Sequence, residues 1–441
     1  MVIKRDIEFF FEEWKKSSNR KPLLLQGARQ IGKTWAMEHF GRTHYRHCVK
    51  FDFDRSPELH SVFAETKEPD RILKELAAYC KEPLLPEKTL IIFDEIQECE
   101  NALNSLKYFY EEAPQYHIMA AGSLLGVAVK RRNMTVPVGK VRLARMYPIT
   151  FAEFLHSADE STYNYINSLE EIRHMPAVVL NKLLLEYKRY QICGGMPESV
   201  VAMLSGKGTG DIEDILQDIL DLYELDFAKY ASPVEIPRIR AIWHSLPAQL
   251  SKENRKFIYK VVREGARSKD YEDALLWLND AGMIYKVHCI SKPGIPLSGY
   301  AETNAFKVYA CDGGLLRRLA KVGADVIMNG NAGYTEFKGA MAENIVLQSL
   351  MANRQIEQPY YWTSGNTAEI EFVVQYNNEP LPIEVKAAGN TSGRSLYVYN
   401  EKFSPKHLIR FSANNLQLKD KLLNIPSPMA AWMTKLIDMV K

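Results

Sequence analysis

The sequence predicts an α/β protein whose core is a parallel sheet. Between residues 21 and 154, short apolar runs alternate with segments of helical periodicity, an order typical of parallel strands joined by helices. A glycine-rich loop follows the first of these runs, and a later run ends in two acids. Strand-like runs after residue 360 predict a further α/β region near the C-terminus.

Length and composition limit the classes of protein that need to be considered. A chain of 441 residues is too long for one ordinary core, so we expect roughly two to four domains. The six cysteines are far apart and form no C-x-x-C pair, which argues against a disulfide framework and a zinc site. The N-terminus lacks the apolar core of a secretory signal, and no apolar run reaches the about 18 residues of a membrane span. We therefore expect a cytoplasmic protein without a membrane partner, and the net charge of +2 neither requires nor excludes nucleic acid.

The glycine-rich loop has the spacing of a phosphate-binding loop. Its residues are Gly27, Ala28, Arg29, Gln30, Ile31, Gly32, Lys33 and Thr34. Two glycines let the backbone N–H groups turn inward, and the following helix directs its positive dipole end at a bound anion. In this pattern Lys33 reaches the β- and γ-phosphates and Thr34 ligates Mg²⁺. The alternative is a simple glycine turn, but the apolar run before the loop and the helical segment after it favour nucleotide binding.

The apolar run at 89–95, Thr-Leu-Ile-Ile-Phe-Asp-Glu, ends in the two acids. It resembles the Walker B strand of P-loop ATPases, in which Asp94 would hold Mg²⁺ and Glu95 would polarise the attacking water. The alternative is a strand that ends in a solvated acidic turn. The presence of the phosphate-binding loop favours the first interpretation.

The middle of the chain is predicted to be mainly helical. Glycine and proline at 194–198 mark a break, and 206–210 is the clearest linker-like segment. Short helices precede two strand-like runs at 283–290 and 306–311, which suggests a winged-helix arrangement. The helix at 271–281 carries Asp and Glu where a major-groove reader needs Arg and Asn, so we favour a form that does not read bases.

The last hundred residues contain a second group of charged residues. Glu343 lies near the start of a predicted helix, and two predicted strands carry Glu371, Glu384 and Lys386. Period-two alternation puts Glu384 and Lys386 on one face of their strand. Three acids and a lysine at one sheet edge could hold Mg²⁺ and orient water for phosphodiester hydrolysis. The alternative is the polar face of an ordinary sheet, and the residues alone favour that alternative.

Taken in order, these motifs resemble those of one family. From about residue 19 almost to its end, the chain resembles the prokaryotic AAA-type ATPases with a C-terminal domain of unknown function called DUF4143. The motifs are 27–34, 90–95, 121–123, Tyr-Pro-Ile-Thr-Phe-Ala-Glu-Phe at 147–154, Gly-Gly-Met-Pro-Glu at 194–198, and 369–373 with 383–386. The resemblance implies an ATPase core related to the Orc/Cdc6 and STAND-like branches at 1–154, a helical lid at 155–205, a helical or winged-helix module at 206–325 and a domain similar to PD-(D/E)xK nucleases at 326–441.

The resemblance also implies roles for individual residues. Ser123 is at the point where AAA-type ATPases place a polar sensor for the γ-phosphate or the lytic water, although it is equally suited to capping the next helix. Pro197 belongs to a Gly-x-Pro element through which a lid approaches the nucleotide. The residues that match the nuclease pattern are Glu343, Glu371, Glu384 and Lys386.

The sequence departs from the family pattern at three positions. Glu198 follows the lid motif where a basic sensor would be expected. Lys140 replaces the usual arginine before the 147–154 motif, and lysine lacks the forked charge of an arginine finger. Glu371 replaces a usual aspartate, and its longer side chain weighs against a Mg²⁺ site for cleavage. The remaining finger candidates are Arg131, Arg132, Arg142 and Arg145.

The leading functional hypothesis is a protein that binds ATP with Mg²⁺ and hydrolyses ATP slowly. Hydrolysis would drive or time a rearrangement of the C-terminal domains, with DNA or another protein as the partner. No guanine-reading Asn-Lys-x-Asp motif is present, which favours ATP over GTP. The alternatives are a nucleotide-dependent switch with little turnover and a Mg²⁺-dependent DNA nuclease in the C-terminal domain. Monomer and oligomer both remain open.

Overall fold

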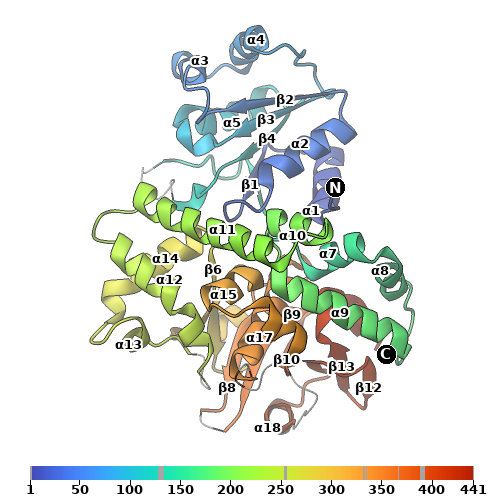
Figure 1. The fold of residues 1–441 in the computed structure, drawn as a ribbon. Helices are drawn as coiled ribbons and strands as arrows, with labels where there is room; N and C mark the ends of the chain where they lie inside the picture. The colour runs from blue at the N-terminus through green and yellow to red at the C-terminus, as the bar shows by residue number, and fades with distance from the viewer. Residues whose placement is uncertain are drawn as a thin grey trace. The chain divides into compact units, whose positions relative to one another are not determined.

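The computed structural model describes residues 2–440, except for 128–133, 253–255, 331–332, 334, 366 and 388–392. The chain divides into two compact units, each with its own sheet (Figure 1). The N-terminal unit contains residues 4–146 with 280–282, and the C-terminal unit contains residues 1–3, 147–279 and 283–441.

The N-terminal unit is built on a five-stranded sheet of order β2-β3-β4-β1-β5 in which every pairing is parallel. Its strands are β1 (Leu23–Gln26), β2 (His47–Asp52), β3 (Thr89–Asp94), β4 (His117–Ala121) and β5 (Arg142–Arg145). Every residue of β3 and β4 is buried, as expected for parallel strands covered on both faces. The predicted α/β fold with a parallel core is confirmed.

Helices connect these strands and cover the sheet (Figure 1). They are α1 (Ile7–Lys16), α2 (Lys33–His44), α3 (Leu59–Glu65), α4 (Pro69–Tyr79) and α5 (Glu100–Glu112), with a 3₁₀ turn, η1, at Ile96–Glu98. An aromatic cluster joins the sheet to α3 and α5, because the ring of Phe93 on β3 makes edge contacts with Phe51, Phe53, Phe63 and Phe109. This core supports β3 up to Asp94, its last residue.

The C-terminal unit begins with a helical region. Its helices are α7 (Phe151–Ala158), α8 (Glu160–Asn167), α9 (Ala177–Cys193), α10 (Pro197–Leu204), α11 (Thr209–Tyr230), α12 (Ile236–Leu250), α13 (Tyr259–Val262) and α14 (Ser268–Asp280). A capping box explains part of the 147–154 motif, since Thr150 accepts from the Glu153 N–H and Glu153 accepts from the Thr150 N–H. Phe151 and Phe154 are buried in contact with the ring of Tyr190 on α9.

The C-terminal unit also contains an eight-stranded mixed sheet of order β12-β13-β11-β10-β9-β8-β6-β7. Its strands are β6 (Ile284–Ile290), β7 (Ala301–Ala310), β8 (Tyr360–Thr363), β9 (Glu369–Tyr376), β10 (Glu379–Val385), β11 (Leu408–Ser412), β12 (Gln417–Lys419) and β13 (Leu422–Pro426). The predicted ribbon of two strands is the antiparallel pair β6 and β7. Because β6 also pairs with β8, the ribbon and the later strands form one continuous sheet.

Further helices pack around this sheet (Figure 1). They are α15 (Gly313–Leu319), α16 (Ala324–Asn329), α17 (Thr335–Ala352), α18 (Arg394–Phe403) and α19 (Met433–Asp438). Helix α17 starts earlier than predicted, so Glu343 lies near its middle rather than near its start. Its Asn344 anchors it to β7, because the side chain donates to the Ala310 carbonyl and accepts from the Ala310 N–H.

Candidate functional site

The phosphate-binding loop connects β1 to α2 in a conformation that depends on glycine. Gly27 and Gly32 have φ angles of +149° and +86°. A Cβ on Gly27 would lie 2.3 Å from the Met146 carbonyl oxygen, so no larger residue fits there. Gln30 also has a positive φ, of 63°, which is costly for a residue with a side chain. The loop is therefore compact and strained, as functional loops often are.

Lys33 is a buried cation at the first position of α2. Its Nζ donates to the carbonyl oxygens of Gly27 at 2.9 Å and Ala28 at 2.7 Å. Among the described residues this ammonium forms no ion pair. Burial lowers the pKa of Lys33 to about 8, although the charges of Glu95 and Asp94 act on the ammonium and raise its pKa. A buried ammonium without a carboxylate partner would be stabilised by an anion, so this loop suits a triphosphate.

Thr34 and Asp94 bring two oxygen ligands together. The Thr34 hydroxyl donates to the Asp94 carboxylate, with Oγ1 2.9 Å from Oδ2 and 3.1 Å from Oδ1. Burial raises the pKa of Asp94 to about 6, despite the opposing effect of this hydrogen bond. A hydroxyl beside a buried carboxylate is the kind of donor set that Mg²⁺ takes when phosphate oxygens complete its coordination. These two residues fit Mg²⁺.

Glu95 follows Asp94 and is held by three hydrogen bonds. The Ser123 hydroxyl donates to Oε1 at 2.8 Å, and the Ser123 N–H donates to Oε2 at 3.1 Å. Gln97 Nε2 donates to the same Oε2 at 2.6 Å. Burial alone would raise the pKa of Glu95, but the hydrogen bonds from Gln97 and Ser123 outweigh burial and lower it. Glu95 also has a φ of +48°, a strained conformation typical of active sites.

Two residues of this site were not predicted from the sequence. Gln97 is only 1% exposed and holds Glu95; its only sequence signal is its place two residues after the acidic pair. Arg5 is 5% exposed, and its Nη1 donates to the Ile31 carbonyl of the phosphate-binding loop at 3.2 Å. An arginine so far from the motif in sequence carries no local signal of this contact.

The arginine-finger candidates lie in different environments. Arg131 and Arg132 lie outside the described residues. The Arg142 guanidinium lies 4.9 Å from the centre of the Phe10 ring, while Arg145 is exposed at the end of β5. Lys140 forms an ion pair with Glu111, with Nζ 2.7 Å from Oε1. None of these contacts identifies a finger.

The glycine-proline motif at 194–198 belongs to the C-terminal unit. The Gly195 N–H donates to Asp312 Oδ2 at 2.6 Å, and the Gly195 carbonyl accepts from the Ile149 N–H at 2.7 Å. Pro197 is the first residue of α10, followed by the exposed Glu198. The polar contacts of this motif are thus internal to its unit, and a role for Pro197 at the nucleotide stays a prediction.

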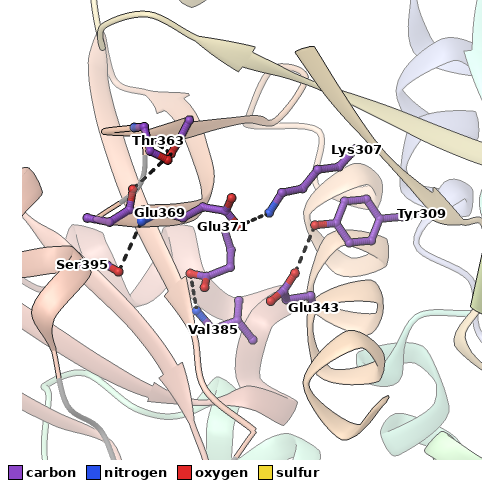
Figure 2. Close-up of polar contacts among 10 residues, drawn as sticks. Lys307, Tyr309, Glu343, Thr363, Glu369, Glu371, Val385 and Ser395 are labelled. Carbon is purple, nitrogen blue, oxygen red and sulfur yellow. Dashed lines mark hydrogen bonds and ion pairs between the residues drawn. The ribbon is translucent and has the colours of Figure 1, made fainter. Parts of the chain in front are cut away.

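The predicted tail site contains acids that already have partners (Figure 2). Glu343 accepts from the Tyr309 hydroxyl at 3.1 Å, and Glu371 accepts from the Val385 N–H at 3.2 Å. Burial raises the pKa of Glu371. The acids are thus brought into one region, as the sequence suggested, but with internal hydrogen-bond donors.

Basic residues complete this region. Glu384 lies between Arg410 Nε, at 2.8 Å, and Lys386 Nζ, at 3.3 Å, and Lys307 forms an ion pair with Glu369. Among the described residues, no three His, Cys, Asp or Glu side chains are grouped so that they could hold a metal ion. Glu384 Oε1 is buried and accepts no hydrogen bond from the described residues, but Arg410 and Lys386 already bring positive charge to this carboxylate, and this disfavours a divalent cation there. Lys307 had one sequence signal, as a lone charge inside the apolar run 305–310.

Comparison with protein families agrees with these motifs and with the parallel core. Residues 19–155 match the model described as "AAA domain", and residues 338–429 match "Domain of unknown function (DUF4143)". The chain is an AAA-type P-loop protein with a C-terminal DUF4143 domain. The predicted family is therefore confirmed. Between its AAA and DUF4143 domains, residues 184–326 match "Domain of unknown function (DUF8612)".

Several solved structures are weakly similar to this AAA and DUF4143 protein. The Walker-type ATPase PABY2304 of Pyrococcus abyssi has 17% identity and a TM-score of 0.41, and the match covers 72% of this chain and 96% of that one. The Aeropyrum pernix ORC2 protein has 13% identity and a TM-score of 0.35, with 70% and 87% covered. The Aeropyrum pernix ORC1 protein, solved in complex with DNA, has 10% identity and a TM-score of 0.27, with 73% and 93% covered. These scores are too low to support an argument about activity or partners.

Two further comparisons are negative. No curated protein sequence matches the chain. In the part of the AAA and DUF4143 protein that the structure describes, no helix has the length and apolar character needed to cross a bilayer.

Proposed function

We propose that the AAA domain binds ATP together with Mg²⁺ and hydrolyses ATP slowly. The observation that carries this proposal is the buried Lys33 ammonium, which is held by two loop carbonyls and has no carboxylate within ion-pair distance among the described residues. The charges of Glu95 and Asp94 oppose the effect of burial on the pKa of Lys33 without forming an ion pair, and the phosphates of ATP would provide negative charge in direct contact. A side chain at Gly27 would collide with the Met146 carbonyl. Glycine therefore permits the loop conformation in which the phosphates can approach the backbone closely.

Thr34 and Asp94 would hold the Mg²⁺ ion through a hydroxyl and a carboxylate oxygen. Bound Mg²⁺ would neutralise charge on the phosphates and orient them. Burial destabilises the charged form of Asp94 and raises its pKa, so a nearby cation would stabilise that charged form. The aromatic core around Phe93 holds this carboxylate at the end of β3, which keeps its position relative to α2 well defined.

Glu95 would orient the attacking water and accept its proton. Three hydrogen bonds from Ser123 and Gln97 hold its carboxylate and lower its pKa. A carboxylate with a lowered pKa is a weaker base, and this supports slow rather than rapid turnover. Ser123 would act as a positioning residue through Glu95, in addition to any contact with the γ-phosphate.

We further propose that hydrolysis times a rearrangement of the C-terminal unit on DNA or on a partner protein. The chain passes from β5, which pairs with β1, into the C-terminal unit at residue 147. A shift of β1 at the phosphate-binding loop would therefore reach the capping box at Thr150 through a few residues of backbone. The six cysteines are free thiols, which supports a reducing location such as the cytoplasm.

The proposal is tested by phosphate release and nucleotide binding in the full chain with Glu95→Gln. We expect ATP binding to persist while steady-state hydrolysis falls about a hundredfold, because the general base is lost. Glu112→Gln, an exposed change at the end of α5, is the matched control and should leave both unchanged. Equal, barely measurable turnover in wild type and Glu95→Gln, with ATP binding intact, would favour the switch with little turnover. If the wild-type chain does not bind ATP, the proposal is wrong.

The nuclease alternative gains no support from the tail. Its acids already pair with internal cations and donors, and this disfavours a divalent ion. We therefore propose no hydrolytic activity for the DUF4143 domain.

A further inference from the structure

Lys307 is a fully buried lysine on β7, with 0% of its side chain exposed (Figure 2). Its ammonium forms an ion pair with Glu369 of β9 and lies 4.9 Å from the centre of the Tyr361 ring on β8. A buried ammonium is strongly destabilised unless nearby groups replace its lost hydration. Both of its partners belong to the tail strands, whereas Lys307 precedes Glu369 by 62 residues.

β7 contributes a second polar residue to the same region. Tyr309 lies two positions after Lys307, on the same face of β7, and its hydroxyl donates to Glu343 of α17 at 3.1 Å. Figure 2 shows the Lys307 and Tyr309 side chains pointing toward the acids Glu371 and Glu343. The ribbon of β6 and β7 therefore gives Glu343 a hydroxyl donor and places the Lys307 ammonium, paired with Glu369, where its charge opposes the effect of burial on the pKa of Glu371.

The opposite end of this acidic region is also neutralised. Glu384 is fully buried between Arg410 of β11 and Lys386. In the resemblance to nucleases, Glu343, Glu371 and Glu384 are the acids that would hold the metal, with Lys386 beside them. A divalent ion at these acids would bring two more positive charges into a region that already contains the buried Lys307 and Arg410, neither of which belongs to the nuclease pattern.

We infer that Lys307 is the resident cation of the tail acids and takes the place that a divalent ion holds in nucleases with this pattern. The ammonium compensates the negative charge from within the fold. The DUF4143 tail is then a metal-independent structural element, held to the β6 and β7 ribbon by the ion pair of Lys307 with Glu369. The inference does not depend on the proposed ATPase activity.

The first test is metal binding by the folded full chain. Asp94→Asn removes the carboxylate ligand of the nucleotide site, and Mn²⁺ is then titrated while the free ion is followed by electron paramagnetic resonance. We expect no Mn²⁺ bound at the tail at millimolar concentrations. Binding of Mn²⁺ that disappears when Glu371→Gln is added to Asp94→Asn would overturn the inference.

The second test removes the cation itself. Lys307→Met roughly keeps the length of the side chain. The unfolding temperature should fall by about 5–10 °C, because Glu369 loses its buried partner. In the Asp94→Asn background, which lacks the carboxylate ligand of the nucleotide site, added Mn²⁺ should restore part of this loss in Lys307→Met but leave the chain with Lys307 unchanged. Lys406→Met is the control, since Lys406 forms a comparable pair with Glu379 at 3.4 Å but is 67% exposed. If Lys307→Met unfolds no earlier than Lys406→Met, or if Mn²⁺ stabilises the Asp94→Asn chain through Glu371 while Lys307 is intact, the inference is wrong. If Lys307→Met does not fold, the Mn²⁺ titration of the Asp94→Asn chain still tests whether the tail acids bind a divalent ion.

Discussion

The hydroxyl and the backbone N–H of Ser123 both donate to the carboxylate of Glu95, at 2.8 Å and 3.1 Å. Ser123 follows β4 and Glu95 follows β3, so neighbouring parallel strands meet at this carboxylate. The orientation of the proposed general base therefore depends on a residue from another strand. The interaction explains why a small hydroxyl residue suits this position.

Ser123→Ala should slow ATP hydrolysis about tenfold while ATP affinity stays within about twofold of wild type. The change removes the hydroxyl donor to Glu95 but leaves the N–H donor, and a hydrogen bond to a charged group contributes about 1.5–3 kcal/mol. Steady-state kinetics and nucleotide titration would check this split. Ser61→Ala, at an exposed position of α3, is the control. A loss of ATP affinity with an unchanged rate would contradict the positioning role.

Gln97→Met should shift the acid limb of the ATPase pH profile to higher pH. Gln97 lowers the pKa of Glu95 by donating to Oε2, and without this donor the burial of Glu95 is less opposed. Glu95 would then take up a proton at a higher pH, so activity would decline earlier as the pH falls. The measurement is kcat as a function of pH for both proteins. A uniform loss of activity at every pH would indicate a structural effect instead.

The pH dependence of ligand binding should have two limbs. The pKa of Asp94 is raised to about 6, so below this pH a proton competes with Mg²⁺ and apparent Mg²⁺ affinity should fall up to about tenfold per pH unit. The pKa of Lys33 is lowered to about 8, so above this pH the free protein loses the charge that ATP needs, and ATP affinity should fall. Titrations of Mg²⁺ and ATP between pH 5 and pH 9 would check both limbs. Flat affinities across this range would refute the assigned roles.

Arg5→Met should weaken ATP binding several-fold, because the Arg5 guanidinium donates to the Ile31 carbonyl and so supports the phosphate-binding loop. Arg46→Met, an exposed change in the same unit, provides the control. Fluorescent nucleotide titration is the measurement. Unchanged affinity in Arg5→Met would show that the loop keeps its conformation without this contact.

Asp312→Asn should lower the free energy of unfolding by about 2–4 kcal/mol without altering nucleotide affinity. Asp312 is fully buried and accepts from the N–H groups of Gly195 at 2.6 Å and Leu315 at 2.9 Å. An amide would place its own donor against one of these N–H groups. Chemical denaturation measures the change in stability. Asp325→Asn, at an exposed position near the start of α16, is the comparison and should change stability little.

Much of the nucleotide site was predictable because its signals are local. The phosphate-binding loop is contiguous, and its glycines are required by backbone angles that act within a few residues. The buried strand that ends at Asp94 and Glu95 was visible as an apolar run that ends in charge. The α/β class and the family followed from the order of these segments.

The helical region was less predictable in its contacts. The sequence predicts a lid element at 194–198, which stays a prediction, but it gives no sign that the Gly195 N–H donates to Asp312, 117 residues away in sequence. Local periodicity gives the helices but contains no information about such distant pairs. The winged-helix interpretation likewise included the β6 and β7 ribbon but not its pairing with β8.

The sequence by itself determined the parallel core, the phosphate-binding loop, Lys33, Thr34 and the two acids of β3. Only the tertiary structure placed Gln97 and Ser123 on Glu95, and Lys307 among the acids of the tail. The physical reason is that backbone conformation and burial depend on neighbouring residues in the chain. The pairing of buried charges depends on which strands lie together, and that is decided when the whole sheet forms.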